Sequence, residues 1–199
     1  MRQNEGPLRA LICEDEGITV MQLRQVLTGA RFDIIGEAMD GSTGVELARD
    51  LHPDFILMDV NLQGMNGVEA TRQIMQERPT AVIMLTAYGD DKTVDQALEA
   101  GASYYLVKPI VGQQLIPAIR TAVARFEAME SVRRENEGLK DQLETRKLVE
   151  RAKGVLMDRL RLSEVEAFRR MQHISRNKCQ TMKQTATEII GAAKILSKV

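Results

Sequence analysis

The sequence has few of the residues that build disulfide frameworks or histidine metal sites, and no stretch that would span a membrane. It contains two cysteines, two histidines and no tryptophan among 199 residues. Cys13 and Cys179 lie far apart, without the short spacing of a metal or redox motif, so we expect both to be reduced thiols. No run approaches the roughly 18 apolar residues of a membrane helix, and the segment MRQNEGPLR lacks the apolar stretch of a signal peptide. These absences predict a cytoplasmic protein with no membrane partner.

The composition supports a folded core, and the charge is divided along the chain. Hydrophobic residues make up 44% of the sequence and charged residues 28%, with an overall net charge of −1. Residues 1–144 carry a net charge of −9, whereas residues 145–199 carry +8. An acidic front and a basic rear indicate two modules with different partners, and the basic module is suited to a polyanion.

The first 110 residues alternate short apolar runs with longer segments whose apolar residues recur every three to four positions. The predicted strands are 8–13, 32–38, 55–59, 81–86 and 103–107, and the predicted helices are 17–29, 42–51, 67–77 and 91–100. Strands that alternate with helices predict an α/β fold with a parallel sheet and helices on both faces. In such sheets, ligands bind at the carboxyl ends of the strands.

Polar residues follow four of the predicted strands at that edge. Glu14 and Asp15 follow the first strand and Asp59 ends the third, while Thr86 ends the fourth and Lys108 follows the fifth. Each residue taken singly is also explained as a helix or turn cap. Their joint placement indicates a site, because a carboxylate at the end of the buried run FILMD must be hydrogen-bonded, metal-bound or reactive.

Carboxylates that converge on one sheet edge repel one another, and a hard divalent cation relieves this repulsion. Mg²⁺ prefers a few carboxylate oxygens, water and a phosphate. Glu14, Asp15 and Asp59, with the backbone carbonyl of Asn61, supply such a partial set of ligands. The sequence therefore predicts a Mg²⁺ site.

The same edge has the groups that phosphoryl transfer needs. Lys108 brings a positive charge and Thr86 a hydroxyl donor, and the small Ala87 leaves the pocket open, so Asp59 is placed to attack as a nucleophile and form an aspartyl phosphate. Enzymes of the haloacid dehalogenase type also form an aspartyl phosphate, but they need a second aspartate two residues later, where this sequence has Asn61. We therefore expect a phosphoacceptor regulatory protein and not an enzyme.

The motifs LICEDE, ILMDVNLQGMNG, MLTAY and GASYYLVKP occur in this order at suitable spacing. With them, residues 8–125 resemble the receiver domain of two-component response regulators. The resemblance implies a flavodoxin-like, five-stranded parallel sheet and phosphorylation of Asp59 by a sensor histidine kinase. It implies the same metal ligands and phosphoryl contacts, and it identifies Tyr105 as the switch aromatic that moves inward as Thr86 turns toward the phosphate. Gln63 stands where the family often has proline.

From about residue 113 the pattern is helical. A heptad places Ala122, Met129, Asn136 and Leu143 at position a, and Arg125, Val132, Leu139 and Arg146 at position d. This predicts a connecting helix that forms a coiled-coil dimer, in which an asparagine at position a fixes the register. A solvated connecting helix is the alternative.

Residues 145–199 read as three amphipathic helices that pack as a small all-α bundle. The expected buried faces are Val149, Ala152, Val155 and Leu156, then Val165, Phe168 and Met171, and then Ala186, Ile189 and Ile190. In the segment LSEVEAF, Ser163 as N-cap and Glu166 three residues later form a capping box. Basic residues remain on the outside, which favours phosphate binding over mere solvation of the helix faces.

The basic module fits either DNA or RNA as its polyanionic partner. The segment MKQTATEII loosely resembles the first helix of a DNA-binding helix-turn-helix, but only nine residues follow Ile190, which is short for a turn and a recognition helix. A receiver-driven DNA-binding regulator and a phosphate-relay or protein-binding regulator are the alternatives to RNA binding.

The segment ERAKGVLMDRLRLSEVEAFRRMQHISRNK, followed by TATEII, resembles the ANTAR domain of transcription antitermination regulators. The resemblance implies binding to paired RNA hairpins with hexanucleotide loops in nascent transcripts, and antitermination as the outcome. We expect phosphorylation to promote a homodimer that presents two basic bundles. Because this segment has no tryptophan or tyrosine, arginine stacking and hydrogen bonds are expected to contact the bases. The predicted RNA contacts are Arg176, Lys178, Lys183, Gln184 and Thr185, together with Arg169 and Arg170.

The predicted organisation follows from the two resemblances. It comprises an N-terminal tail at 1–7, a receiver domain at 8–125, a helical or coiled-coil linker at 126–144 and an ANTAR RNA-binding domain at 145–199.

Overall fold

The structure is a computed structural model that describes residues 6–87 and 91–196, with the backbone alone for residues 91–93 and 194–196. The chain divides into two compact units, residues 1–130 and 131–199. Helix α5 (Gly112–Leu160) is continuous and contributes to both units. Each unit is described by itself.

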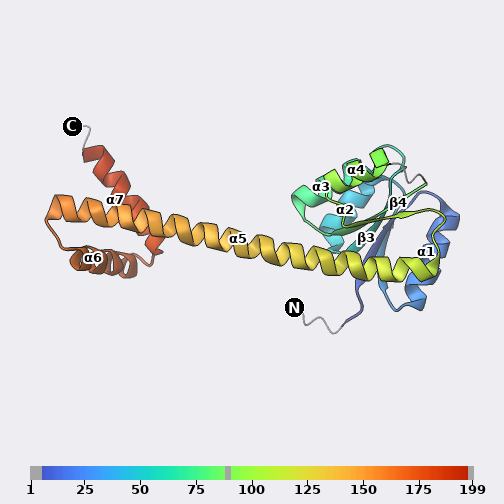
Figure 1. Ribbon diagram of the computed structural model, residues 1–199, viewed down its shortest axis with the longest axis horizontal. Helices are drawn as coiled ribbons and strands as arrows, with labels where there is room; N and C mark the ends of the chain where they lie inside the picture. The colour runs from blue at the N-terminus through green and yellow to red at the C-terminus, as the bar shows by residue number, and fades with distance from the viewer. Residues whose placement is uncertain (1–5, 88–90, 197–199) are drawn as a thin grey trace. The chain divides into compact units, whose positions relative to one another are not determined.

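The first unit contains a parallel sheet of five strands in the order β2-β1-β3-β4-β5 (Figure 1). The strands are β1 (Arg9–Cys13), β2 (Asp33–Ala38), β3 (Phe55–Asp59), β4 (Ala81–Thr86) and β5 (Tyr104–Val107). The helices between them are α1 (Gly17–Gly29), α2 (Gly41–Leu51), α3 (Gly67–Glu77) and α4 (Asp91–Glu99). The predicted α/β fold is confirmed, and the elements lie close to the predicted ranges.

Alternate residues of the strands supply two separate cores, one on each face of the sheet. Leu11, Ile56 and Met58 pack on one face with apolar residues of α2, α3 and α4. Ile12 and Leu57 pack on the other face with apolar residues of α1 and of the first turns of α5. Both faces of β3 and β4 are buried, which explains why their sequences are apolar without alternation.

Two glycines allow the loops at the carboxyl edge of the sheet to approach one another. A Cβ atom at Gly67 would lie 1.9 Å from the carbonyl oxygen of Asp59, and one at Gly41 would lie 2.3 Å from that of Met65. These distances exclude any larger residue without a backbone shift. Gly67 therefore lets the start of α3 pack directly against the end of β3.

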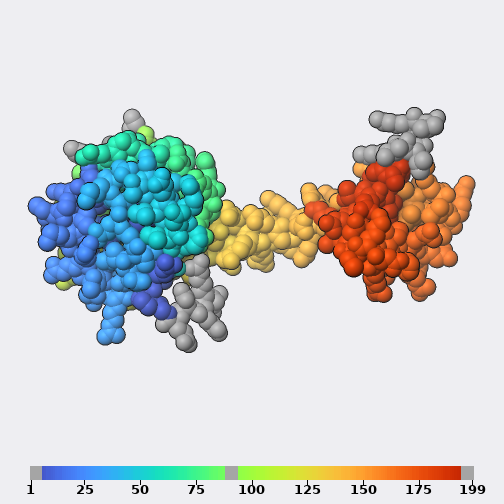
Figure 2. Space-filling view, turned by 180° about the vertical axis from the view of Figure 1, so that it is seen from behind, coloured from blue at the N-terminus to red at the C-terminus, as the bar shows by residue number. Residues whose placement is uncertain are grey.

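The second unit contains the C-terminal half of α5, α6 (Glu164–Asn177) and α7 (Met182–Leu196). Its core consists of Ala152 and Leu156 from α5, Ala167 and Met171 from α6, and Ala186 and Ile190 from α7. Figure 2 shows α6 and α7 in deep orange to red beside the orange end of α5. The predicted helical bundle and the capping box at α6 are confirmed.

The prediction that Val165 and Phe168 are buried in the bundle is wrong. Val165 and Phe168 are 61% and 39% exposed, whereas the neighbouring Ala167 and Met171 are fully buried. The buried stripe of α6 is thus rotated by one position from the stripe that apolar spacing suggested.

The predicted heptad is also divided. Ala122 is buried in the core of the first unit, so it contributes nothing to a coiled-coil seam. Met129 in the first unit and Val132, Leu139 and Leu143 in the second are exposed. No helix in the described part of the chain is both long enough and apolar enough to cross a membrane.

Candidate phosphoacceptor and metal site

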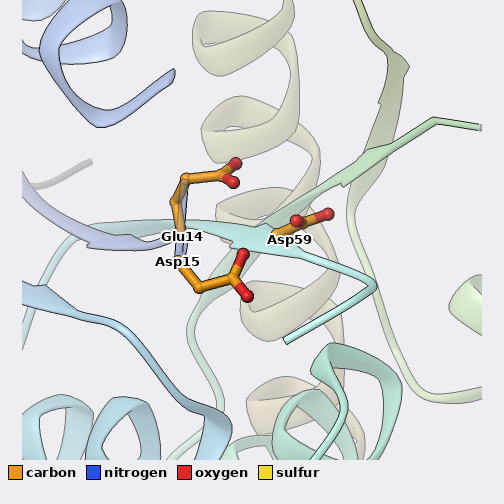
Figure 3. A group of neighbouring side chains, drawn as sticks. All are labelled: Glu14, Asp15 and Asp59. Atoms are coloured by element: carbon orange, nitrogen blue, oxygen red, sulfur yellow. The ribbon is translucent and has the colours of Figure 1, made fainter. Parts of the chain in front are cut away.

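The carboxyl ends of β1 and β3 bring three carboxylates together. One oxygen from each of Glu14, Asp15 and Asp59 lies within 4.8 Å of the others (Figure 3). Glu14 and Asp15 directly follow β1, and Asp59 is the last residue of β3. Since β1 and β3 pair in parallel and in register, the topology alone places these residues side by side.

Lys108 provides positive charge between two of these carboxylates. Its ammonium nitrogen lies 2.8 Å from Glu14 Oε2 and 3.0 Å from Asp59 Oδ2. The side chain of Glu14 is 0% exposed, that of Asp59 6% and that of Lys108 20%. The backbone N–H of Lys108 donates to the carbonyl oxygen of Thr86 at 2.7 Å, which fixes the start of the loop after β5.

The pKa values reflect this crowding. Burial raises the pKa of Glu14 and the charge of Asp59 raises it further, and these effects outweigh the opposing contact with Lys108. Burial lowers the pKa of Lys108, but its hydrogen bonds to the two carboxylates and their charges outweigh burial, so the pKa is raised overall. Lys108 therefore stays protonated, while burial and the neighbouring charge make ionisation of Glu14 less favourable than in water.

The remaining hydrogen bonds of the carboxylates come from the backbone. The N–H of Asn61 donates to Asp59 Oδ1 at 3.4 Å, and the N–H of Glu16 donates to Glu14 Oε1 at 3.3 Å. Glu14 Oε2 is buried, and its partner among the described residues is the ammonium group of Lys108.

These features fit a hard divalent cation. Three carboxylates at a single edge are oxygen ligands of the kind that such ions prefer, and one lysine does not balance the charge of three of them. The acidic cluster is thus a candidate metal site by donor type, charge and spacing.

The other predicted residues lie around this cluster. Thr86 is buried at the end of β4, and Ala87 is exposed beside it. Ala87 and Lys108 line a hollow of ≈ 310 Å³ whose wall also includes Glu16 and Pro109, residues that the sequence analysis did not single out. Glu16 is the third acid of the segment CEDE, so the sequence did contain a sign of its role, but its position directly before a predicted helix also explains it as a helix cap.

Tyr105 is 39% exposed on β5, and its ring stacks on that of Tyr104 with the centroids 6.4 Å apart. Gln63 forms an isolated bridge with Asp40, so the residue that replaces proline keeps the loop after β3 attached to the end of β2.

The predicted RNA contacts of the second unit include exposed arginines, lysines that form ion pairs, and two residues that serve local structure. Arg169, Arg170 and Arg176 are exposed on α6. Lys178 pairs with Glu188 at 2.7 Å, and Lys183 pairs with two acids of α5.

The last two predicted contacts serve local structure. Gln184 accepts a hydrogen bond from the N–H of Thr181 and so caps α7. Thr185 is fully buried, with an Oγ1 that has no partner among the residues described, and we therefore leave it out of the contact surface.

Comparison with known proteins assigns both units. Residues 10–120 match the response regulator receiver domain, and residues 137–190 match the ANTAR domain. The transcriptional regulatory protein PdtaR of Mycobacterium tuberculosis (strain H37Rv) is 40% identical over 184 residues, which are 92% of this chain and 90% of PdtaR.

Two solved structures resemble the first unit. The response regulator domain of Thermotoga maritima CheB is 31% identical with a TM-score of 0.56, and the match covers 59% of this chain and 97% of that one. A chain of the CheX–CheY–BeF3–Mg²⁺ complex from Borrelia burgdorferi is 30% identical with a TM-score of 0.56, covering 57% and 87%. From these matches and the shared architecture, the chain belongs to the response regulators, with a receiver domain followed by an ANTAR domain.

Proposed function

We propose that this response regulator is phosphorylated on Asp59 by a sensor histidine kinase in the cytoplasm, and that phosphorylation controls RNA binding by the second unit. The observation that carries the proposal is the cluster of Glu14, Asp15 and Asp59 beside Lys108 at the carboxyl edge of the sheet. The chain is a regulatory protein and not a conventional enzyme. We assign 8–125 to the receiver, 126–144 to the linker and 145–199 to the RNA-binding domain.

In the proposed reaction, a carboxylate oxygen of Asp59 attacks the phosphorus atom of the donor. A new P–O bond forms while the bond from phosphorus to the donor breaks. Lys108 already lies at Asp59 Oδ2, so it is placed to stabilise the negative charge of the transferred group. Thr86 would donate a hydroxyl hydrogen bond to the same group.

Mg²⁺ would be held by Glu14, Asp15 and Asp59 with the Asn61 carbonyl. When bound, it supplies charge neutralisation and orients the phosphoryl oxygens. The resemblance to a chain solved with BeF3 and Mg²⁺ supports this assignment.

A labelling experiment tests the receiver. Wild-type protein and the variant Asp59→Asn are incubated with acetyl phosphate and MgCl2, and incorporated phosphate is measured by mass spectrometry. We expect one phosphoryl group in the wild type and none in the variant. Asp50→Asn, which changes an exposed aspartate on α2, is the matched control and should be labelled normally. Stoichiometric labelling of Asp59→Asn would contradict the assignment.

The proposed partner of the second unit is a pair of RNA hairpins in a nascent transcript, with antitermination as the result. Its net charge of +8 over residues 145–199 and the match to the ANTAR domain support this partner. The exposed Arg169, Arg170 and Arg176 are the proposed phosphate and base contacts, with Lys178 and Lys183 joining once they leave their acidic partners.

We further propose that the phosphorylated protein is a homodimer. Exposed apolar side chains at heptad spacing on α5 (Val132, Leu139 and Leu143) support a coiled-coil seam, with Asn136 fixing its register. Two hairpins on one dimer gain avidity that a single hairpin lacks. Phosphorylation should therefore tighten binding to a two-hairpin RNA much more than to either hairpin alone. Equal tightening on both RNAs would refute the dimer, and a flat salt dependence would refute phosphate contacts.

A further inference from the structure

Two large apolar side chains of the second unit lie on its surface, where the apolar pattern predicted core. Val165 and Phe168 of α6 are 61% and 39% exposed. Phe168 is also the one aromatic residue between positions 145 and 199. A single exposed apolar residue is common on protein surfaces, but here two of them border the same hollow of a strongly basic unit.

Phe168 and Val165 border a hollow of ≈ 410 Å³ that is lined by residues of α6 and by Lys153 of α5. This volume lies within the roughly 300–1,000 Å³ that is usual for small-ligand sites. The hollow is lined by Lys153, Glu164, Val165, Phe168, Arg169 and Gln172.

The polar groups of this lining are not arranged for an anion. Lys153 is nearly buried, and its ammonium nitrogen contacts Glu150 at 2.9 Å and Glu164 at 2.6 Å, so its charge is already compensated. The carboxylate of Glu164 would repel a phosphate. The exposed cation of the rim is Arg169, on the same helix as Phe168.

Two side chains of the lining are available for new hydrogen bonds. In the part of the chain that the structure describes, neither the amide of Gln172 nor the guanidinium of Arg169 forms a hydrogen bond. Glu164 is 66% exposed and uses one carboxylate oxygen toward Lys153, so its other oxygen remains an acceptor. The hollow thus offers an aromatic ring, an apolar side chain, an amide and a carboxylate.

We propose that this hollow binds one unstacked base of the RNA, which stacks on Phe168 and hydrogen-bonds through its edge to Gln172 and Glu164. The proposal rests on the RNA binding proposed above and names the part of the RNA that this surface takes. Unstacked bases are commonly held between aromatic rings and amide or guanidinium groups. A carboxylate accepts from an exocyclic amino group, so adenine, cytosine or guanine is preferred over uracil, which has none.

The charges favour a base over a protein partner. Arg169 and Arg170 lie next to Phe168 in sequence and are exposed, so a phosphate can be held beside a ring that stacks the attached base. A lining of six residues is also much smaller than the roughly 20–30 residues per side of a standard protein interface. The neutral base enters the hollow while its phosphates remain on the basic rim.

The test uses the full-length phosphorylated protein and a two-hairpin RNA with six-nucleotide loops, selected by the wild-type protein from a pool with random loop sequence. Phe168→Leu removes the ring but keeps an apolar side chain, and Phe168→Tyr keeps the ring. We expect Phe168→Leu to weaken binding by roughly 5- to 100-fold, the usual effect of losing one base–aromatic stack. Phe168→Tyr should bind like the wild type.

Further measurements identify the base. Gln172→Ala should weaken binding, whereas Gln142→Ala, which changes an exposed glutamine of α5 outside the hollow, should not. The slope of affinity against salt should be the same for Phe168→Leu and the wild type, because a base contact releases no counterions. When each loop nucleotide is made abasic in turn, one position should weaken the wild type and leave Phe168→Leu unchanged.

Each other outcome decides against the proposal. If the wild type binds with a steep salt slope and Phe168→Leu binds equally well, RNA binding stands and the base site is refuted. If Phe168→Leu instead lowers dimerisation in sedimentation experiments at unchanged RNA affinity, the hollow is a protein contact. If the wild type binds no RNA, the proposed function fails and the base site with it.

Discussion

Replacing Lys108 with methionine should destabilise the first unit, and added Mg²⁺ should reverse much of the loss. The change removes the ammonium group between Glu14 and Asp59, both of which are almost fully buried. Removing one partner of a buried ion pair costs about 3–5 kcal/mol. Lys108 retains 20% exposure, and Glu14 with its raised pKa can take up a proton, so we expect a loss of about 2–3 kcal/mol at neutral pH.

The loss should depend on pH with a defined sign. The pKa of Glu14 is raised in the folded protein and should rise further without the ammonium group. A folded carboxyl with a raised pKa holds its proton where the unfolded one has released it, so stability falls as the pH rises through the folded pKa. The deficit of Lys108→Met should therefore shrink in acid and grow toward neutral pH.

Tyrosine fluorescence during urea unfolding measures this effect, because all three tyrosines (88, 104 and 105) lie in the first unit and the sequence has no tryptophan. Unfolding is followed with EDTA and with MgCl2. A ligand at about 100 times its Kd stabilises by about 2.7 kcal/mol, which is comparable to the expected deficit. Lys153→Met, which removes the nearly buried lysine of the second unit, is the matched control, and its tyrosine signal should respond to Mg²⁺ as that of the wild type does.

Equal unfolding free energies for Lys108→Met and the wild type in EDTA would refute the view that Lys108 compensates the buried charges. Equal stabilisation of Lys153→Met and Lys108→Met by Mg²⁺, relative to the wild type, would show that the rescue does not come from the acidic cluster.

Three further changes test other parts of the structure. Gly67→Ala should abolish labelling by acetyl phosphate or unfold the first unit, because its Cβ would lie 1.9 Å from a carbonyl oxygen. The control Gly138→Ala, on an open helix surface, should raise the unfolding free energy by about 0.5–1 kcal/mol. Normal labelling of Gly67→Ala would contradict the packing described. Thr185→Val should raise the unfolding free energy of the second unit or leave it unchanged, since the buried Oγ1 has no partner among the described residues. RNA affinity should be unaltered, and a lower affinity would return this residue to the contact surface. Asp141→Asn should raise RNA affinity by about 2- to 5-fold at low salt, because it removes one of the two exposed ion pairs of Lys183, at 2.7 Å. The gain should disappear in a Lys183→Ala background.

The sheet and its site were predictable because strand ends are defined by both burial and topology. The runs that form β3 and β4 are buried on both faces, so they stand out as unbroken apolar segments. In a parallel sheet their carboxyl ends share one edge, which places Asp59 and Thr86 on the same side as Glu14 without any knowledge of the helices. The hollow beside Ala87 was not predictable, since its walls combine residues of α1 and the start of α5 with residues of the loops after β4 and β5, and their approach depends on packing.

The helical bundle was predicted less well, for a physical reason. On a helix, apolar residues three or four apart share a face, but two overlapping stripes on α6 satisfy this spacing equally well. Small Ala167 gives the close approach to α5 and α7, so the stripe that contains it is buried, while Phe168 is left outside. Charge counting has a similar limit, because it cannot tell that Lys183 already has acidic partners on another helix.

The acids beside Lys183 affect how strongly any transcript binds. Any nucleic acid attracts a lysine through its phosphates alone, whatever its sequence. Asp141 and Glu144 form ion pairs with this lysine at 2.7 and 3.0 Å. A non-cognate transcript must therefore break these ion pairs before it binds Lys183, and it gains little net binding free energy from the contact. An RNA that also contacts the rest of the surface gains enough binding free energy there to offset the cost of breaking these ion pairs. Because breaking the two ion pairs costs every transcript the same free energy, this pair of acids leaves the ratio of the two affinities unchanged, but it makes a contact with Lys183 alone too weak to hold an RNA.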